Sequence, residues 1–284
     1  MKNKDASYSP PKVWRWTSAS GGKFATINRP VAGSTHDSPL PIGRHPIQLY
    51  SLGTPNGVKV TILLEELLAR GVGEADYDAH LIDIFKGDQF GKGFVEINPN
   101  SKIPALVDYG SSEPVKVFES GAILVYLADK FQNFLPSNSA LRAECMSWVC
   151  WQMSCTPYFG GGFGHFFHYA PEKLEYAINI YANEVRFQFD ILDRHLSANQ
   201  YLCGSEYTIA DIAIWPWYGA MFYENFYEAF DLLGIESCKH LHRWADDISN
   251  RDAVEKGRKV NRNWGVHPAE QVPERHEESD FVIE

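Results

Sequence analysis

The spacing of apolar residues divides the chain into a mixed first part and a helical second part. Two segments, one beginning near Pro55 and one at residue 119, repeat apolar residues at the spacing of one helix face. A loop or short helix is expected between the second and third strands. Alternating elements of this kind predict a sheet with helices packed on its faces. Short apolar runs predict four strands, at 47–51, 77–83, 105–108 and 115–118.

From about 138 to 264 almost every segment has the helical period instead. A domain boundary is therefore expected near 133–138. The predicted fold is an α/β domain followed by an all-α domain, with an extension at each end. The expected ranges are 1–46, 47–132, 137–264 and 265–284.

The two extensions have different compositions. Residues 1–46 are rich in Pro, Gly, Ser and Thr, yet Trp14, Trp16, Phe24 and Ile27 indicate that they pack on something. Residues 265–284 carry six acidic residues against a single arginine. A charge-dense end is usually mobile, so we expect a solvated tail.

Composition excludes several function classes. The net charge of −10 argues against nucleic-acid binding and against an anionic membrane surface. No apolar run approaches the ~18 residues of a membrane span, and the N-terminus lacks a signal-peptide core. The five cysteines include no CxxC pair, which disfavours a disulfide framework or a zinc ribbon. A reducing cytoplasm is the simplest setting.

The turn between the first strand and the first helix reads SLGTPNG, residues 51–57. A strand, a tight turn and a helix start commonly hold a catalytic group, but this turn has no Cys or His. It offers Thr54, Pro55 and Asn56 with two glycines. Pro55 suits the first turn of a helix.

Two more motifs stand at the starts of elements. Ile103-Pro104 is a candidate cis bond because it joins a turn to a strand, although a trans proline at a strand start is the plainer alternative. Glu119-Ser120 at a helix start is explained equally well as a cap or as a binding site. In the second case the Ser and the helix end bind a carboxylate, and the Glu binds an ammonium.

Motifs of the helical part have structural explanations. Thr208 and Asp211 match a capping box. The stretch GGGFGHFFHYAP, residues 160–171, predicts an aromatic wall of a pocket or of the domain interface. His165 and His168 lack acidic or Cys ligands at metal spacing, so no metal site is predicted.

In order, these pieces resemble the glutathione transferase superfamily. The turn, SKIPALVD and the Glu-Ser helix start are similar to its thioredoxin-like half, and TIADIAIWPW is similar to its helical half. The resemblance covers essentially the whole chain. SLGTPNGVKVTILLEELL, GGGFGHFFHYAPEKLEYAIN and FATINRP are closest to bacterial nu-class enzymes, also described as glutathione-dependent disulfide-bond oxidoreductases.

The resemblance implies a homodimer and a glutathione site with one or two glutathiones per subunit. Glu119 and Ser120 would hold the γ-glutamyl ammonium and carboxylate. The backbone of Ile103, before Pro104, would pair with the cysteinyl amide.

Five further residues complete the implied site. Thr54 and Asn56 would face the glutathione sulfur as the catalytic pair, with Pro55 between them. Gln89 would contact the glycyl end or a second glutathione, and Asn28 would reach into the same cleft from the extension.

Two positions depart from the family pattern. Met153 stands where a pocket Gln is expected, with Gln152 beside it, and Ile180 stands where an Arg is expected. An Arg there would form a charge-assisted pair with a carboxylate of the second glutathione. Whether a second glutathione binds is therefore open.

The first functional hypothesis is a glutathione-dependent disulfide reductase in which the cofactor's own sulfur is the nucleophile, with weak transferase or peroxidase activity. The second keeps the thiolate but changes the electrophile, giving a conjugating transferase or a glutathione lyase on aromatic ethers. The third is a non-catalytic glutathione-binding regulator.

Overall fold

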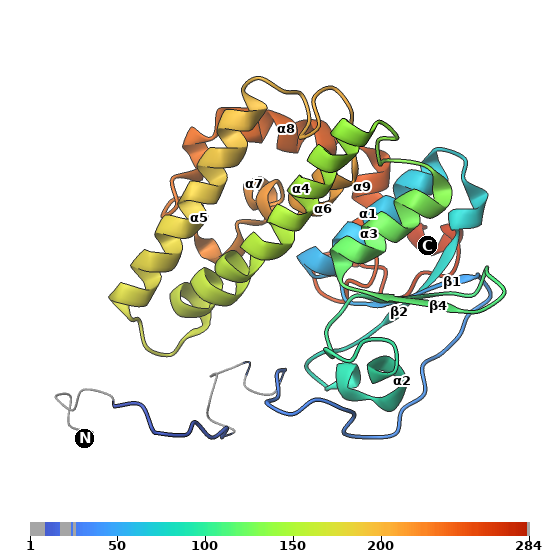
Figure 1. The fold of residues 1–284 in the computed structure, drawn as a ribbon, viewed down its shortest axis with the longest axis horizontal. Helices are drawn as coiled ribbons and strands as arrows, with labels where there is room; N and C mark the ends of the chain where they lie inside the picture. The colour runs from blue at the N-terminus through green and yellow to red at the C-terminus, as the bar shows by residue number, and fades with distance from the viewer. Residues whose placement is uncertain (1–8, 18–23, 25–26, 283–284) are drawn as a thin grey trace.

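The computed structural model describes residues 9–17, 24 and 27–282. One end of the molecule is a sheet covered by helices and the other is a group of long helices (Figure 1). The four strands lie in the order β2-β1-β3-β4, with β1 parallel to β2 and all other neighbours antiparallel. Their bounds are β1 Ile47–Ser51, β2 Tyr77–Leu81, β3 Ala105–Asp108 and β4 Val115–Phe118.

The central strand β1 is buried on both faces, and its side chains alternate between two cores. Ile47 and Leu49 join the main core, under α1 (Pro55–Ala69) and α3 (Ser120–Phe131). Tyr50 joins a smaller core with Phe94 of the short helix α2 (Lys92–Val95). The sheet therefore has α1 and α3 on one face and α2 on the other (Figure 1). This is the predicted β-α-β-β-β-α order, with a short helix before β3.

The helical part begins with α4 (Ser139–Thr156), which continues into a π-helical segment, Pro157–Tyr169. Helix α6 is buried at every position, as expected of a helix that is apolar all round. It packs against α1 and α3 and so joins the two parts.

The bounds of the other elements of the helical part, with those of α6, complete the fold. The helices are α5 Glu175–Leu196, α6 Ile209–Tyr218, α7 Met221–Glu224, α8 Lys239–Ser249 and α9 Asp252–Gly257. Short 3₁₀ turns lie at Gly73–Ala75, Asp88–Phe90, Phe226–Glu228, Ile235–Ser237, Pro268–Glu270 and Glu278–Phe281. None of the described helices is long and apolar enough to cross a membrane.

The capping box predicted for the helical part is confirmed, and the aromatic wall stays a prediction. Thr208 and Asp211 form the capping box that starts α6. The glycine-rich segment 157–169 packs closely against aromatic rings: a Cβ on Gly160 would lie 2.7 Å from the Trp217 ring, and one on Gly162 2.3 Å from Tyr181. A side chain at either glycine would push the facing ring away, so the two glycines allow this close packing.

The prediction of a solvated C-terminal tail is wrong. The backbone of Arg275 pairs with the outer edge of β2, through Ala79 N–H to Arg275 C=O at 2.7 Å and Arg275 N–H to Ala79 C=O at 3.2 Å. The Arg275 side chain is 1% exposed, and its Nη1 donates to Asp76 Oδ1 at 2.5 Å. Glu274, Glu277 and Glu278 are exposed while Arg275 turns inward, and the paired segment covers an edge strand.

The segment before the tail crosses the first turn of the α/β part. Gly53 N–H donates to Asn261 C=O at 2.7 Å. A Cβ on Gly53 would stand 3.1 Å from the Arg262 Cα, so a side chain there would push the crossing segment away by a few tenths of an ångström. Residues 261 and 262 are thereby fixed beside the start of α1.

The N-terminal extension packs in part. Thr35 N–H donates to Phe90 C=O at 2.9 Å, and the Phe24 ring contacts the edge of Tyr169 at 4.5 Å between centroids. Trp14 and Trp16 remain 59% and 43% exposed, in a stretch that lies apart from the body of the chain (Figure 1). The packing expected of the extension is therefore found around residue 24 and beyond 27.

Candidate functional site

The turn that ends β1 and starts α1 leaves a hydroxyl without a partner. Thr54 is the N-cap of α1, but its side chain makes no capping hydrogen bond. Pro55 takes the first helical position, as predicted. Gly57 lets the first helical turn lie against the end of the strand, since a Cβ there would stand 2.1 Å from the Leu52 carbonyl oxygen. The Thr54 hydroxyl is therefore presented at a helix N-terminus, free to bind a ligand.

A fully buried lysine lies beneath this turn. Lys59 Nζ donates to Asn56 Oδ1 at 2.8 Å, to Gln152 Oε1 at 2.7 Å and to Ser120 Oγ at 3.4 Å. These three acceptors come from α1, α4 and the start of α3, and they match the three N–H bonds of an ammonium. Lys59 thus joins the starts of both helices of the sheet domain to the helical part.

The amide of Asn56 is fixed by two donors. Its Oδ1 accepts from Lys59 and also from Trp217 Nε1 at 2.9 Å. The Asn56 Nδ2 group has no hydrogen-bond partner among the described residues. With the oxygen held from two sides, the amide can rotate little and its N–H bonds remain available to a ligand.

The electrostatics of the site favour an anion. Burial holds the pKa of Lys59 well below its usual value, while the negative charge of Glu119 opposes that effect. The N-termini of α1 and α3 meet around Lys59, and helix N-termini carry partial positive charge. No acidic residue lies in the first turn of either helix. An anionic ligand group would supply the charge that the protein leaves uncompensated.

The loop before β3 offers free backbone groups. The Ile103-Pro104 peptide bond is cis, which confirms that sequence prediction. Neither the N–H nor the C=O of Ile103 has a hydrogen-bond partner among the described residues. An extended peptide could pair with both groups, as it would with the edge of a sheet.

A hollow of about 200 Å³ brings four of the predicted residues together: Asn28, Thr54, Gln89 and Ile103. Gln89 is 1% exposed, and its Nε2 donates to Ile84 C=O at 3.2 Å. The Gln89 Oε1 atom is buried without a partner. A buried acceptor is costly to leave unpaired, so this atom suits an N–H donor from a ligand. Asn28 is held at the rim, where its Oδ1 accepts from Lys102 Nζ at 2.9 Å.

The Glu-Ser helix start is strained. Glu119 is exposed with φ of +70°, a conformation that non-glycine residues rarely adopt. Ser120 is 4% exposed and touches both Lys59 and the Met153 sulfur, the latter at 3.7 Å. Met153 therefore lies against this helix start. Ile180 is 48% exposed on α5 and lines neither hollow at Thr54.

A second hollow, of about 290 Å³, lies on the other side of Thr54, between the turn and the helical part. Four of its thirteen lining residues are aromatic, and the lining also has two arginines and one glutamate. The lining residues are Gly53, Thr54, Pro55, Val58, Tyr169, Trp215, Pro216, Ala220, Glu224, Phe226, Arg258, Arg262 and Trp264.

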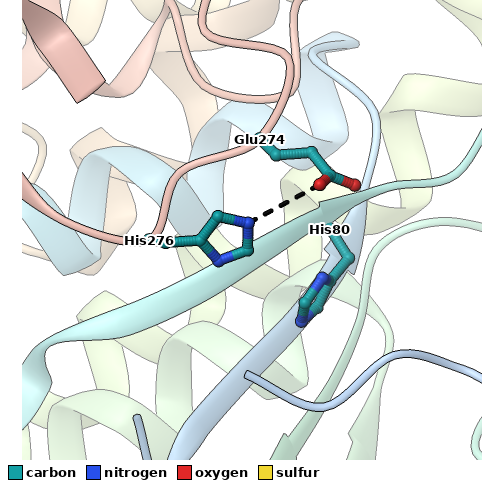
Figure 2. A group of neighbouring side chains, drawn as sticks. All are labelled: His80, Glu274 and His276. Atoms are coloured by element: carbon teal, nitrogen blue, oxygen red, sulfur yellow. Dashed lines mark ion pairs between the residues drawn. The ribbon is translucent and has the colours of Figure 1, made fainter. Parts of the chain in front are cut away.

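Among the described residues one cluster could hold a metal ion, although the sequence predicted no metal site. Figure 2 shows His80 on β2 facing Glu274 and His276 of the tail, with ligand atoms within 4.8 Å of one another. Zinc takes such ligands. Hydrogen bonds already account for the two rings, with His80 Nε2 at 2.9 Å from Gln48 Oε1 and His276 Nδ1 at 2.7 Å from Asp78 Oδ1. We therefore interpret the group as an anchor of the tail.

Sequence reasoning missed Lys59, Trp217 and Gln152. One signal was present for Lys59, a cation between Val58 and Val60 in an otherwise apolar helix. Nothing local to Trp217 or Gln152 indicates that they meet Asn56 and Lys59, because that contact depends on how two domains pack.

Comparison with known proteins agrees with this geometry. The model of the glutathione S-transferase N-terminal domain matches residues 45–129, and that of the C-terminal domain matches residues 181–247. The disulfide-bond oxidoreductase YghU of Escherichia coli is 56% identical over 277 residues, 98% of this chain and 96% of the relative.

Two solved structures are also similar. Glutathione transferase YghU from Streptococcus pneumoniae, complexed with glutathione, has a TM-score of 0.87 and 52% identity, over 89% of this chain and 97% of that one. A family member from Pseudomonas fluorescens with two glutathiones bound has a TM-score of 0.69 and 40% identity, over 75% and 92%. With the shared fold, the cis-proline loop and near full-length identity above half, the chain belongs to the glutathione transferase family.

Proposed function

We propose that this protein reduces disulfide bonds with glutathione, using the thiolate of bound glutathione as the nucleophile. The observation that carries the proposal is the free Thr54 hydroxyl beside the fixed Asn56 amide, at a helix start without an acidic residue. A relative at 56% identity is named a disulfide-bond oxidoreductase.

The chain has groups that fit each part of the tripeptide. Ser120 and the start of α3 would take the γ-glutamyl carboxylate, and Glu119 its ammonium. The free N–H and C=O of Ile103 would pair with the cysteinyl amide. Gln89 and Asn28 would contact the glycyl end from the 200 Å³ hollow.

Thr54 and Asn56 would stabilise the thiolate. A free thiol titrates near pH ~8.5, so only a few per cent is ionised at pH 7. Hydrogen bonds from the Thr54 hydroxyl and Asn56 Nδ2 to the charged sulfur lower that pKa, as does a helix N-terminus. These donors are in place before the ligand arrives.

Lys59 and Trp217 are positioning residues in this scheme. They hold Asn56 Oδ1 and so leave Asn56 Nδ2 available to donate to the sulfur. Lys59 also adds positive potential beneath the helix starts, where burial makes a charge more effective than it is in water.

The reaction balances with two glutathiones. One thiolate attacks a substrate sulfur, the S–S bond breaks, and the leaving thiolate takes the electron pair. A second glutathione thiolate attacks the mixed disulfide, so glutathione disulfide and two substrate thiols result. The second glutathione binds in the site or arrives from solution, and counting glutathiones by calorimetry decides between one and two per subunit.

Turnover of 2-hydroxyethyl disulfide with glutathione tests the proposal. We expect saturable reduction well above the uncatalysed rate. Retention on immobilised glutathione without such turnover would instead identify a glutathione-binding regulator.

The aromatic second hollow favours one other activity, conjugation of glutathione to aryl electrophiles or cleavage of aromatic ethers. Tyr169, Trp215, Phe226 and Trp264 would stack on an aryl ring there. Product analysis with aryl electrophiles beside a disulfide distinguishes the two activities.

The class, the oligomeric state and the cellular location of the protein are also proposals. We propose membership of the nu class on the basis of the bacterial disulfide-bond oxidoreductases it resembles, a homodimer as its fold implies, and a reducing cytoplasmic location. All five cysteines are free thiols, four of them buried. Light scattering with multi-angle detection tests the dimer.

A further inference from the structure

We infer that the second hollow selects disulfides that carry a carboxylate on an apolar or aromatic body. This specificity rests on the proposed function. Thr54 borders both hollows, so a sulfur held at Thr54 can be reached by a substrate that enters from the second hollow.

Two arginines share one carboxylate in this hollow. Arg258 Nη2 lies 2.8 Å from Glu224 Oε1, and Arg262 Nη1 lies 3.7 Å from the same oxygen. Two guanidiniums against one carboxylate leave one net positive charge in the lining. Arg258 and Arg262 side chains are 24% and 19% exposed, so solvent screens this charge less than a surface charge.

Arg258 also has a donor to spare. Its Nε is buried and has no hydrogen-bond partner. Its guanidinium lies over the Trp215 ring at 5.4 Å, which holds the plane of the group in place. A substrate carboxylate would bind the exposed N–H groups of the two guanidiniums through charge-assisted hydrogen bonds, and the surrounding aromatic rings would contact its apolar body.

Nearby charges outside the hollow do not cancel this preference. Lys259 and Glu255 are paired with each other at 2.8 Å in the groove beyond the two arginines. Glu270 lines that outer groove and not the hollow beside Thr54. Glu224 is the carboxylate that competes with substrate for the arginines.

The preference enters at the first step of the exchange. The glutathione thiolate attacks the substrate sulfur nearer Thr54, and the leaving thiolate departs with the electron pair of the S–S bond. The carboxylate held at Arg258 orients that bond. A second glutathione then forms glutathione disulfide, so no other reductant is needed.

Three small disulfides test the inference: neutral 2-hydroxyethyl disulfide, anionic 3,3′-dithiodipropionate and cationic cystamine. Each kcat/KM is divided by the uncatalysed rate constant with glutathione, because anionic glutathione itself favours cystamine. We expect the corrected ratio of anionic to neutral substrate to be about tenfold above one in the wild type. A ratio at or below one overturns the inference.

Single substitutions show which residues cause the preference for the anionic disulfide. Arg258→Gln should lower the anionic-to-neutral ratio about tenfold, and Glu224→Gln should raise it by freeing both arginines. Arg194→Gln is the control, since Arg194 is 79% exposed on α5. If Arg258→Gln fails to fold, Glu224→Gln still decides, and an unchanged ratio in Glu224→Gln contradicts the inference.

Failure of the proposed function would show as no turnover of any of the three disulfides. The subsite is then tested by calorimetric binding of 3,3′-dithiodipropionate to the wild type and to Arg258→Gln. Loss of binding in the variant supports the subsite, and equal binding or none in the wild type overturns it.

Discussion

Two basic side chains, Lys59 and Arg275, are buried in the described part of the chain, and their surroundings differ. Arg275 is 1% exposed, beside Asp76 at 2.5 Å and Glu65 at 3.3 Å. Lys59 is 0% exposed, and the acceptors that contact it are neutral amide and hydroxyl oxygens. Burial alone would lower the pKa of Arg275, but Tyr77, Glu65 and Asp76 raise it. The pKa of Lys59 stays well below normal.

The difference separates a structural ion from a functional one. A buried charge with matched partners ties two segments together, here the tail and β2. A buried lysine whose direct contacts are all neutral, with Glu119 as its nearby negative charge, suits an additional anionic group from a ligand.

Arg275→Met should have the largest effect on stability. Removing one partner leaves the Glu65 carboxylate buried without its cation, so the free energy of unfolding should fall by about 3 kcal/mol. Chemical denaturation measures the loss. Arg194→Met is the exposed control and should change stability little. A loss equal to that of the control would show that Arg275 is not a structural tie.

Lys59→Met should affect turnover more than it affects stability. Without Lys59 the Asn56 amide loses one of its two donors, so kcat/KM for 2-hydroxyethyl disulfide should fall about 10²-fold, mostly in kcat. Loss of Lys59 also leaves the buried Gln152 Oε1 without its donor, so the free energy of unfolding should fall by about 1–2 kcal/mol, less than in Arg275→Met. Lys239→Met, at the exposed start of α8, is the control. Unchanged turnover together with a loss of stability as large as that of Arg275→Met would show that Lys59 has a structural role instead.

Thr54→Ala should shift the pH profile without abolishing the site. Loss of one hydrogen bond to the thiolate raises the thiol pKa, so the midpoint of the kcat/KM profile should move up by about one pH unit, or ~1.4 kcal/mol. Thr54→Ser keeps the hydroxyl and should restore the midpoint. An identical midpoint in wild type and Thr54→Ala would exclude Thr54 as a thiolate donor.

His276→Gln should have the smallest effect, and it depends on pH. Burial opposes protonation of His276, but hydrogen bonds to Asp78 and Glu274 raise its pKa overall. Its stabilising contribution is therefore full below the unfolded pKa of ~6.5 and is lost as pH rises through the higher folded pKa.

The measurement is the difference in unfolding free energy between wild type and His276→Gln. His80 has the opposite shift, since burial lowers its pKa, but it is present in both chains and largely cancels. We expect a gap below about 1 kcal/mol near pH 6, because His276 is partly exposed, and a smaller gap near pH 9. A gap that grows with pH would contradict the pairing.

The sequence analysis located the elements well where the pattern is local. The predicted strands at 47–51, 105–108 and 115–118 have the observed bounds. The second strand ends at Leu81 and not at residue 83, because Asp83 turns the chain by accepting from Phe85 N–H at 3.0 Å. The tail was missed since its anchoring depends on Arg275, one basic residue within an acidic segment.

The site shows the same division. Thr54, Asn56 and the Ile103-Pro104 bond stand in local turn and helix-start motifs, which a sequence displays directly. The contact of Lys59 with Gln152 spans 93 positions and appears only when the domains pack.

The tail also determines how late during synthesis the edge of β2 is covered. Arg275 closes the edge of β2, and 198 positions separate it from Tyr77. Domains generally begin to fold as the chain leaves the ribosome, N-terminal segments first. Here the first domain has an open sheet edge until Arg275 is made, so a nascent chain exposes that edge to other chains while the whole helical part is synthesised.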